Sequence, residues 1–193
     1  DEQLRGMEKQ LSLMKALGAT APHPADTTMP DSPPPTDQYP KRVPLTDVQR
    51  DVWITCQLSS EGSAAYNLST LLRLQGDLDV GALEESLRRL ALRHESLRTT
   101  FDASGDYQLI SRTAEPSLVV VDLSDSPEPE RVARFEAFLD ADMSTPYDLV
   151  DGPLFRPGLV RLAGEDHVLV ISTHHLISDG WSLGVMKREL AAI

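Results

Sequence analysis

An apolar run ends in two histidines and a turn signal near the end of the chain. The run, His167–Thr173, is rich in β-branched residues, carries almost no charge and has the length of a strand, so it predicts a buried β-strand. Asp179 and Gly180 then form a turn signal. The apolar positions that follow recur at helical spacing: Leu183, Met186, Leu190 and Ile193. The pattern predicts a strand, a tight turn and a helix as one unit.

Helical and strand-like patterns cover much of the chain between residues 67 and 162. Asp79 is predicted to cap a helix with an apolar stripe formed by Leu83, Leu87, Leu90, Ala91 and His94. A second amphipathic helix is predicted over residues 127–142. Strands are predicted at residues 67–74, 107–112, 118–123 and 154–162, with hairpin turns at 104–105 and 164–166. Strands mixed with helices in this order predict an α/β layered domain.

The composition excludes some classes of function. The chain has 193 residues, one cysteine and a formal net charge of −12, whereas a nucleic-acid-binding protein would need a basic footprint. No stretch reaches the roughly 20 apolar residues of a membrane span, and the start has no signal-peptide pattern. Cys56 cannot form an internal disulfide, which agrees with a reducing compartment. We therefore expect a soluble cytoplasmic protein that contacts neither nucleic acid nor membrane.

Two N-terminal segments differ from the rest of the chain. Residues 19–42 are rich in proline, which predicts a semi-rigid linker rather than part of a core. Before it, residues 1–18 carry Leu4, Met7, Leu11 and Met14 at heptad spacing. They predict a docking or interdomain helix, although a frayed leader is an equal alternative because so short a helix is marginal alone. Residues 43–193 form the expected globular part.

The paired histidines are the candidate chemical groups. Successive strand side chains point to opposite faces, so His174 and His175 cannot both address one ligand, and we expect one to act and one to pack. An unperturbed imidazole pKa of about 6.5 suits His175 as a general base, against the plain alternative of a buried structural histidine. Asp179 can also serve as a helix cap. Zinc needs three or four converging ligands, which this pattern lacks, so no metal is expected.

Residues 174–180 (HHLISDG) and 93–101 (RHESLRTTF), together with residues 45–53 and 147–156, resemble signatures of one family, the condensation domains of nonribosomal peptide synthetases. Residues 174–180 match HHxxxDG and residues 93–101 match RHExLRTxF at every position. Residues 45–53 are similar to SxAQxRLW, although Asp51 stands where the family has arginine. Residues 147–156 resemble FDLxxGPLLR, with Tyr147 in place of phenylalanine. The resemblance spans residues 43 to 193.

The resemblance implies a fold and a reaction. The family shares the chloramphenicol acetyltransferase fold, so we expect an α/β two-layer lobe with a mixed sheet and flanking helices. The implied reaction forms an amide between a thioester donor and an amine acceptor. Both substrates are carried on phosphopantetheine arms of upstream and downstream carrier proteins, next to other synthetase domains. No directly bound cofactor or metal is implied, and residues 45–66 are similar to mixed polyketide and peptide systems.

The resemblance also implies residue roles. His175 would orient the acceptor amine or take its proton, His174 would shape the turn, and Gly180 would permit its backbone path and offer a candidate N–H to the carbonyl oxygen. A buried Arg98 needs an acidic partner. The resemblance implies that this partner is Asp179, in an ion pair that holds the histidine turn in shape.

The end of the chain bears on activity. Ile193 falls partway through the predicted last helix, whereas the family has a second lobe that closes the cleft. We expect half of a condensation domain, either a fragment or a cleavage product, that forms no amide alone because His175 lies in water. Two alternatives stay open: a stand-alone acyltransferase of the same superfamily that uses acyl-coenzyme A, and a non-catalytic docking module based on the leader helix and linker.

Overall fold

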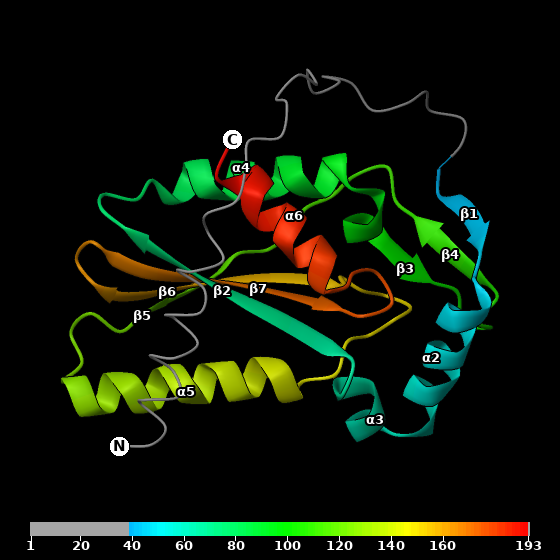
Figure 1. The fold of residues 1–193 in the computed structure, drawn as a ribbon, viewed down its shortest axis with the longest axis horizontal. Helices are drawn as coiled ribbons and strands as arrows, with labels where there is room; N and C mark the ends of the chain where they lie inside the picture. Colours follow the sequence, from blue (N-terminus) through cyan, green and yellow to red (C-terminus); the bar gives the residue numbers. More distant parts are fainter. Residues whose placement is uncertain (1–38, 193) are drawn as a thin grey trace. The chain divides into compact units, whose positions relative to one another are not determined.

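The described strands form two sheets in the computed structural model, which describes residues 39–192 (Figure 1). The larger sheet has the order β2-β7-β6-β5, made of β2 (Asn67–Gln75), β7 (Asp166–His174), β6 (Phe155–Ala163) and β5 (Val119–Asp122). Its neighbours are antiparallel except for β5 and β6, which are parallel. The smaller, antiparallel sheet has the order β1-β4-β3, made of β1 (Lys41–Pro44), β4 (Tyr107–Ile110) and β3 (Thr99–Phe101).

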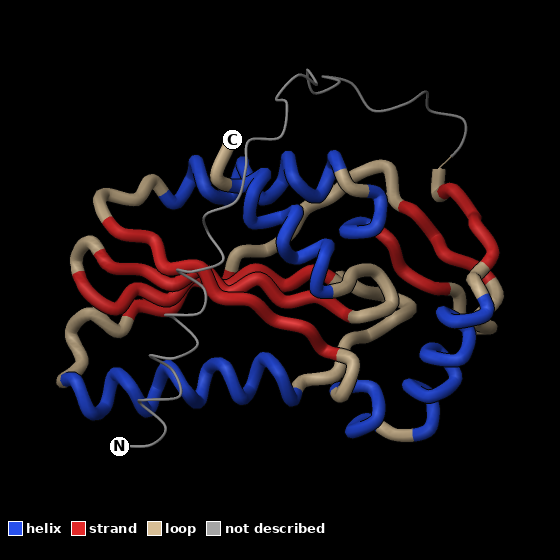
Figure 2. The backbone as a smooth tube through the Cα atoms, in the orientation of Figure 1, coloured by secondary structure: helices blue, strands red, loops and turns tan. Residues whose placement is uncertain are grey.

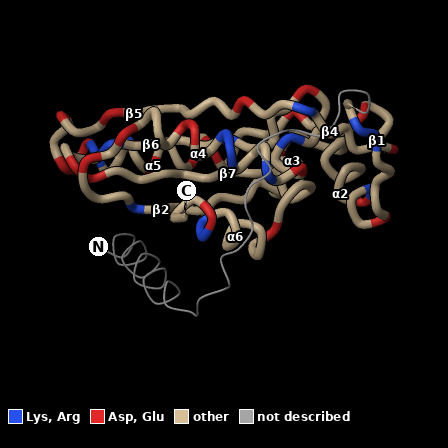
Figure 3. Tube along the Cα trace, turned by 90° about the horizontal axis from the view of Figure 1, so that it is seen from above, with Lys and Arg blue, Asp and Glu red and all other residues tan. Residues whose placement is uncertain are grey.

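Helices lie on both faces of the larger sheet. Figure 1 shows this sheet nearly edge-on, between α4 (Val80–Arg93) and α6 (Gly180–Leu190) on one side and α5 (Glu128–Ser144) on the other. Figure 3, a view from above, shows the strands spread across the sheet from β5 at one edge to β2 at the other. The helix α2 (Asp47–Leu58) stands beside the smaller sheet, and the short helix α3 (Ser60–Ala64) follows it and lies between α2 and the end of α5 (Figure 2).

The period-2 alternation of β7 divides its side chains between the two helical layers. Leu169 and Ile171 belong to one buried cluster with α4 and α6, to which those helices contribute Leu87, Leu90, Ala91, Leu183 and Met186. The alternate residues face α5, where Val170 lies beside Phe138 and the Ser172 hydroxyl bonds Asp142. A strand buried on both faces needs apolar residues at nearly every position, as the continuous apolar run predicted.

Local signals set the ends of the helices. Asp79 accepts a hydrogen bond from the Ala82 N–H at 3.0 Å and caps α4, as predicted. Thr46 and Gln49 form a reciprocal capping box at the start of α2. Gly105, in the β3–β4 turn, has φ +71°, and a Cβ there would approach the Trp53 ring of α2 to 2.5 Å. This glycine therefore lets α2 pack closely on the smaller sheet.

The structure confirms the predicted strands of the larger sheet, both hairpins and the helices at 79–94, 127–142 and after Asp179. The sequence pattern predicts neither α2, α3 nor β1, and β1 includes Lys41 and Arg42, which the pattern assigns to the linker. The predicted leader helix 1–18 and the linker as far as residue 38 lie outside the described residues. Within residues 39–192, no helix is long and apolar enough to cross a membrane.

Candidate active site

The end of β7 directs its two histidines into different surroundings. The His174 side chain is completely buried, whereas His175 is exposed. The backbone is fixed on both sides of the pair, because the His174 N–H donates to the Leu154 carbonyl at 3.2 Å and the His175 N–H donates to the Tyr66 carbonyl at 2.9 Å. The expectation that the two side chains diverge is confirmed.

His174 belongs to the interior. Its Nδ1 accepts the Leu176 N–H at 3.1 Å, so the ring proton resides on Nε2, which lies 3.7 Å from the Cys56 Sγ. Tyr147 contacts the ring edge-on, at 5.8 Å between centroids. Burial, followed by the nearby His175, lowers the pKa of His174 to about 4. The ring is therefore neutral at physiological pH.

His175 lines a groove of about 440 Å³. Its Nδ1 lies 3.0 Å from the Ser178 carbonyl oxygen. A carbonyl can only accept, so Nδ1 carries the proton and Nε2 keeps its lone pair in the neutral ring. The other residues that line the groove come from α2, the β7–α6 turn and the segments beside them: Val48, Gln49, Val52, Tyr66, Leu176, Ile177, Ser178, Asp179 and Ser182.

Asp179 caps α6 at the groove. Its Oδ1 accepts hydrogen bonds from the Ser182 N–H at 2.8 Å and the Ser182 hydroxyl at 2.7 Å. These bonds, and to a lesser degree His175, lower the pKa of the Asp179 carboxyl below its usual range. Gly180 begins α6 without a left-handed φ, and a Cβ there would meet nothing within 4 Å. The backbone path therefore does not require glycine at this position, contrary to the expectation.

Arg98 does not pair with Asp179, so the predicted ion pair is wrong. The Arg98 side chain is 7% exposed, and its charged partner is Glu95 at 3.7 Å, three residues earlier. It also donates to the Ser111 carbonyl, while its Nε has no hydrogen-bond partner among the described residues. Arg98 thus joins the segment before β3 to the segment after β4, and the carboxylate of Asp179 is used as a helix cap.

Gln49 supports the histidine turn instead. Its side-chain amide donates to the Leu176 carbonyl at 3.1 Å and lies 3.3 Å from Gln108 of β4. Gln49 thereby ties the turn to α2 and to the smaller sheet. The sequence contained a signal for this residue, because Gln49 matches the glutamine of the first family signature, but no contact with the turn is predicted from it.

The segment 93–101 contacts α6 at its opposite end. The Glu189 Oε2 lies 3.3 Å from the Arg93 Nε and 2.7 Å from the His94 Nε2. His94 therefore packs at the end of α4 with a polar partner and is remote in sequence and contact from the groove. This agrees with its prediction as a packed residue.

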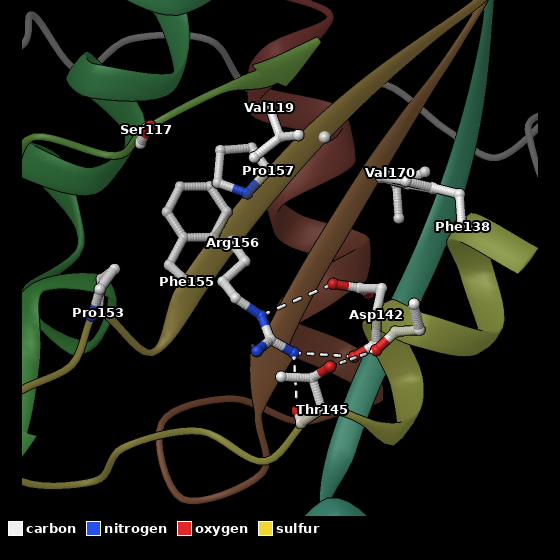
Figure 4. Close-up of a pocket in the computed structure, with 12 residues that line it drawn as sticks. Ser117, Val119, Phe138, Asp142, Thr145, Pro153, Phe155, Arg156, Pro157 and Val170 are labelled. Carbon is white, nitrogen blue, oxygen red and sulfur yellow. Dashed lines mark hydrogen bonds and ion pairs between the residues drawn. The ribbon is translucent and has the colours of Figure 1, made fainter. Parts of the chain in front are cut away.

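A second cavity, of about 390 Å³, lies between α5 and β6 (Figure 4). Its walls are mostly apolar and include Phe138, Phe155 and Val170. Of the described residues that line this cavity, Arg156 is the one lysine or arginine. Its guanidinium lies 3.6 Å from the Asp142 carboxylate and donates to the backbone carbonyls of Asp142 and Thr145 at 2.8 and 3.1 Å. These contacts engage the guanidinium within the protein, and none of these lining residues is a histidine or a cysteine. Within residues 39–192, no cluster of histidine, cysteine and acidic side chains has the arrangement of a metal site.

Comparison with known proteins identifies the family to which the chain belongs. The family model described as Condensation domain matches residues 40–193. The chain belongs to the condensation domain family. The fold class and the resemblance drawn from the four signature segments are thus confirmed.

Two curated relatives of this condensation domain chain are peptide synthetases. A linear gramicidin synthase of Brevibacillus parabrevis is 41% identical over 169 residues, which are 86% of this chain and 2% of the relative. Phosphinothricin tripeptide synthetase PhsC of Streptomyces viridochromogenes is 36% identical over 184 residues, 94% of this chain and 16% of the relative. The chain thus spans a small part of these relatives.

Solved condensation domains have the same fold. The starter condensation domain of the rhizomide synthetase RzmA is 27% identical with a TM-score of 0.71, over 78% of this chain and 36% of that chain. A variant of that domain in complex with C8-CoA is also 27% identical, with a TM-score of 0.70 over 78% of this chain and 34% of that chain. This chain spans about a third of the length of each.

Proposed function

We propose that this lobe supplies the catalytic histidine of a condensation reaction, in which an acceptor amine attacks the carbonyl of a thioester donor and forms an amide. The nitrogen–carbon bond forms, the carbon–sulfur bond breaks, and the proton lost by the nitrogen passes to the leaving thiolate. The names of the relatives, which include a tripeptide synthetase, support a peptide product. Both substrates would be carried as phosphopantetheine thioesters on carrier proteins.

The hydrogen bond from His175 Nδ1 to the Ser178 carbonyl carries this proposal. In the neutral ring it selects the tautomer that carries the proton on Nδ1 and the lone pair on Nε2, and the side chain lines the groove. Nε2 would orient the amine, take its proton during attack and return it to the thiolate. A neutral imidazole is required for this role, and the exposed position of His175 keeps it available to substrate.

The neighbouring residues would position that ring. His174, buried and neutral, accepts the Leu176 N–H and fixes the start of the turn. Gln49 holds the Leu176 carbonyl from α2. Asp179 caps α6 and adds a negative charge near His175, which favours the imidazolium formed when the amine loses its proton. Arg98 would support the fold next to Ser111 and would have no part in the turn.

The test is amide formation by the complete synthetase that contains this lobe, supplied with loaded donor and acceptor carrier proteins. His175→Ala should reduce the rate of amide formation about 100-fold or more, the contribution typical of a general base. The unfolding midpoint of His175→Ala should stay close to that of the unsubstituted protein, because the side chain is exposed. Amide formation at the original rate by a folded His175→Ala protein would refute the proposal.

The same assay separates the sources of the donor. Acyl-coenzyme A and an acylated carrier protein both present a phosphopantetheine thioester, and one solved relative is in complex with C8-CoA. We expect transfer from the acylated carrier protein and little transfer from the free coenzyme A thioester. The reverse preference would favour the acyl-coenzyme A acyltransferase. The 193-residue chain alone should form no amide, because it spans about a third of the solved domains.

A further inference from the structure

The signature segment 93–101 contacts helix α6 at one carboxylate, that of Glu189. Arg93 and His94, the first residues of the segment 93–101, both contact the same oxygen of Glu189, at 3.3 and 2.7 Å. All three side chains are partly buried, at 26% exposed for Glu189, 31% for Arg93 and 30% for His94. Partial burial reduces the screening of such contacts by solvent compared with a surface pair.

This contact joins the segment 93–101 to the helix that Asp179 caps, whereas Arg98 and Asp179 form no contact with each other. Glu189 lies in the last turn of α6, and Asp179 caps the first turn of the same helix. At 1.5 Å per residue, the two ends of α6 are about 14 Å apart. Leu183 and Met186 bury the middle of α6 in the core, so we expect this short helix to respond to a displacement of its last turn as one rigid element.

We propose that Glu189 is a positioning residue for the His175 groove. By joining the last turn of α6 to the end of α4, it fixes the direction of α6 and hence the position of Asp179 and Ser182 in the groove wall. For catalysis, this proposal rests on the proposed role of His175. Its structural part, the coupling between Glu189 and the groove, stands without it.

The expected effect on the reaction is a loss of turnover rather than of substrate binding. A displacement of 1 Å at a reacting centre can cost up to about 100-fold in rate. In the complete synthetase, Glu189→Ala should lower kcat about tenfold and change KM less than about twofold. Glu189→Gln should recover most of the rate, because its amide oxygen can accept from both Arg93 and His94.

Glu85→Ala is the matched control. Glu85 is also a carboxylate with two nitrogen-bearing partners, Arg88 at 2.7 Å and Arg89 at 2.8 Å, but all three residues belong to α4. Removing this carboxylate leaves the same number of partner side chains without their acceptor and does not release α6. A kcat for Glu189→Ala equal to that for Glu85→Ala would overturn the proposal.

Hydrogen exchange tests the coupling independently of activity. Glu189→Ala should exchange the backbone amides of residues 176–183 about fivefold faster than the unsubstituted protein, and Glu85→Ala should leave them unchanged. Unchanged exchange in Glu189→Ala would overturn the proposal even if His175 proves catalytic. Faster exchange would support it even if His175→Ala remains active. If Glu189→Ala fails to fold, His94→Ala, which removes one of the two donors, should give a smaller effect in the same direction, and no effect would overturn the proposal.

Discussion

The two histidines at the end of β7 lie in different environments. The interior side, which holds His174, and the groove side, which holds His175, differ in burial and in hydrogen bonding. His174 is completely buried, accepts a backbone N–H through Nδ1 and has a pKa lowered to about 4. His175 is exposed and donates through Nδ1 to the Ser178 carbonyl. The two rings therefore adopt opposite tautomers.

This difference arises because the two histidines are adjacent in an extended segment, where successive side chains point to opposite faces. Alternation sends one imidazole into the interior, next to Cys56 of α2 and Tyr147, and the other into the groove. The interior ring then satisfies buried backbone and contributes to stability, whereas the groove ring keeps a free nitrogen for chemistry. Substitution of each histidine should consequently separate stability from activity.

The largest effect on stability is expected for His174→Ala. This change leaves the buried Leu176 N–H without its acceptor and opens a cavity beside Cys56 and Tyr147. Together these losses should lower the free energy of unfolding by about 3 kcal/mol, against about 0.5 kcal/mol for His175→Ala. Denaturant titration of both variants gives the comparison. Equal losses for the two variants would mean that the groove ring is as structural as the interior one.

The pH dependence of unfolding should carry the signature of His174. Its pKa is about 4 in the folded protein and 6.5 as the ordinary value, so the unfolded state binds more protons between these limits. Stability is therefore complete above pH 6.5 and decreases as the pH falls toward 4, by up to about 3 kcal/mol at about 1.4 kcal/mol per pH unit.

The variant His174→Gln isolates this contribution from the carboxylates, which also lose stability in acid. Its free energy of unfolding should fall less steeply than that of the unsubstituted protein between pH 6.5 and 4. Parallel curves for the two proteins would show that His174 is as easily protonated in the folded state as in the unfolded one.

The elements that surround the histidines could be predicted because their signals are local. The apolar run before His174, the turn at Asp179 and the spacing of Leu183 and Met186 together specify strand, turn and helix. The helix α2 also has local signals, namely the capping box at Thr46. Its apolar residues are spread around the helix, since Val48 and Leu58 are 73% and 79% exposed, and this weakens the periodicity. The strand β1 has only four residues and directly follows a proline-rich segment, so its sequence does not differ enough from the linker to predict a strand.

The contacts within the site could not be predicted, because a polar residue in the sequence does not specify which of several possible partners it meets in the fold. A buried Arg98 requires a partner, but the sequence does not distinguish Glu95 and the Ser111 carbonyl from a distant aspartate. The pattern also gives no reason for Gln49 to reach Leu176, which is 127 residues away. The family resemblance identified the segments correctly and the pairing between them incorrectly.

A smaller effect is expected for the cap of α6 at the groove side. Asp179→Ala removes the acceptor of both the Ser182 N–H and its hydroxyl. Loss of such a cap should cost about 1 kcal/mol of unfolding free energy. Asp179→Asn, which keeps an accepting oxygen, should recover most of it, and denaturant titration measures both. A cost of several kcal/mol would instead indicate a buried ion pair, of the kind predicted with Arg98.

The smallest effect is expected where α2 supports the turn between the two histidine environments. Gln49→Glu keeps the side-chain oxygen that accepts the Thr46 N–H in the capping box but loses the amide donor to the Leu176 carbonyl. One partly buried hydrogen bond is worth about 1 kcal/mol or less. The global free energy of unfolding should therefore change little, while the amides of residues 176–179 should exchange about threefold faster because the turn opens locally. Thr46→Ala, which disrupts the capping box and leaves the donor to Leu176, is the matched control and should affect α2 rather than the turn. If both variants accelerated exchange equally in α2 and in the turn, α2 and the turn would unfold as one unit, and the groove side would be no more independent than the interior side.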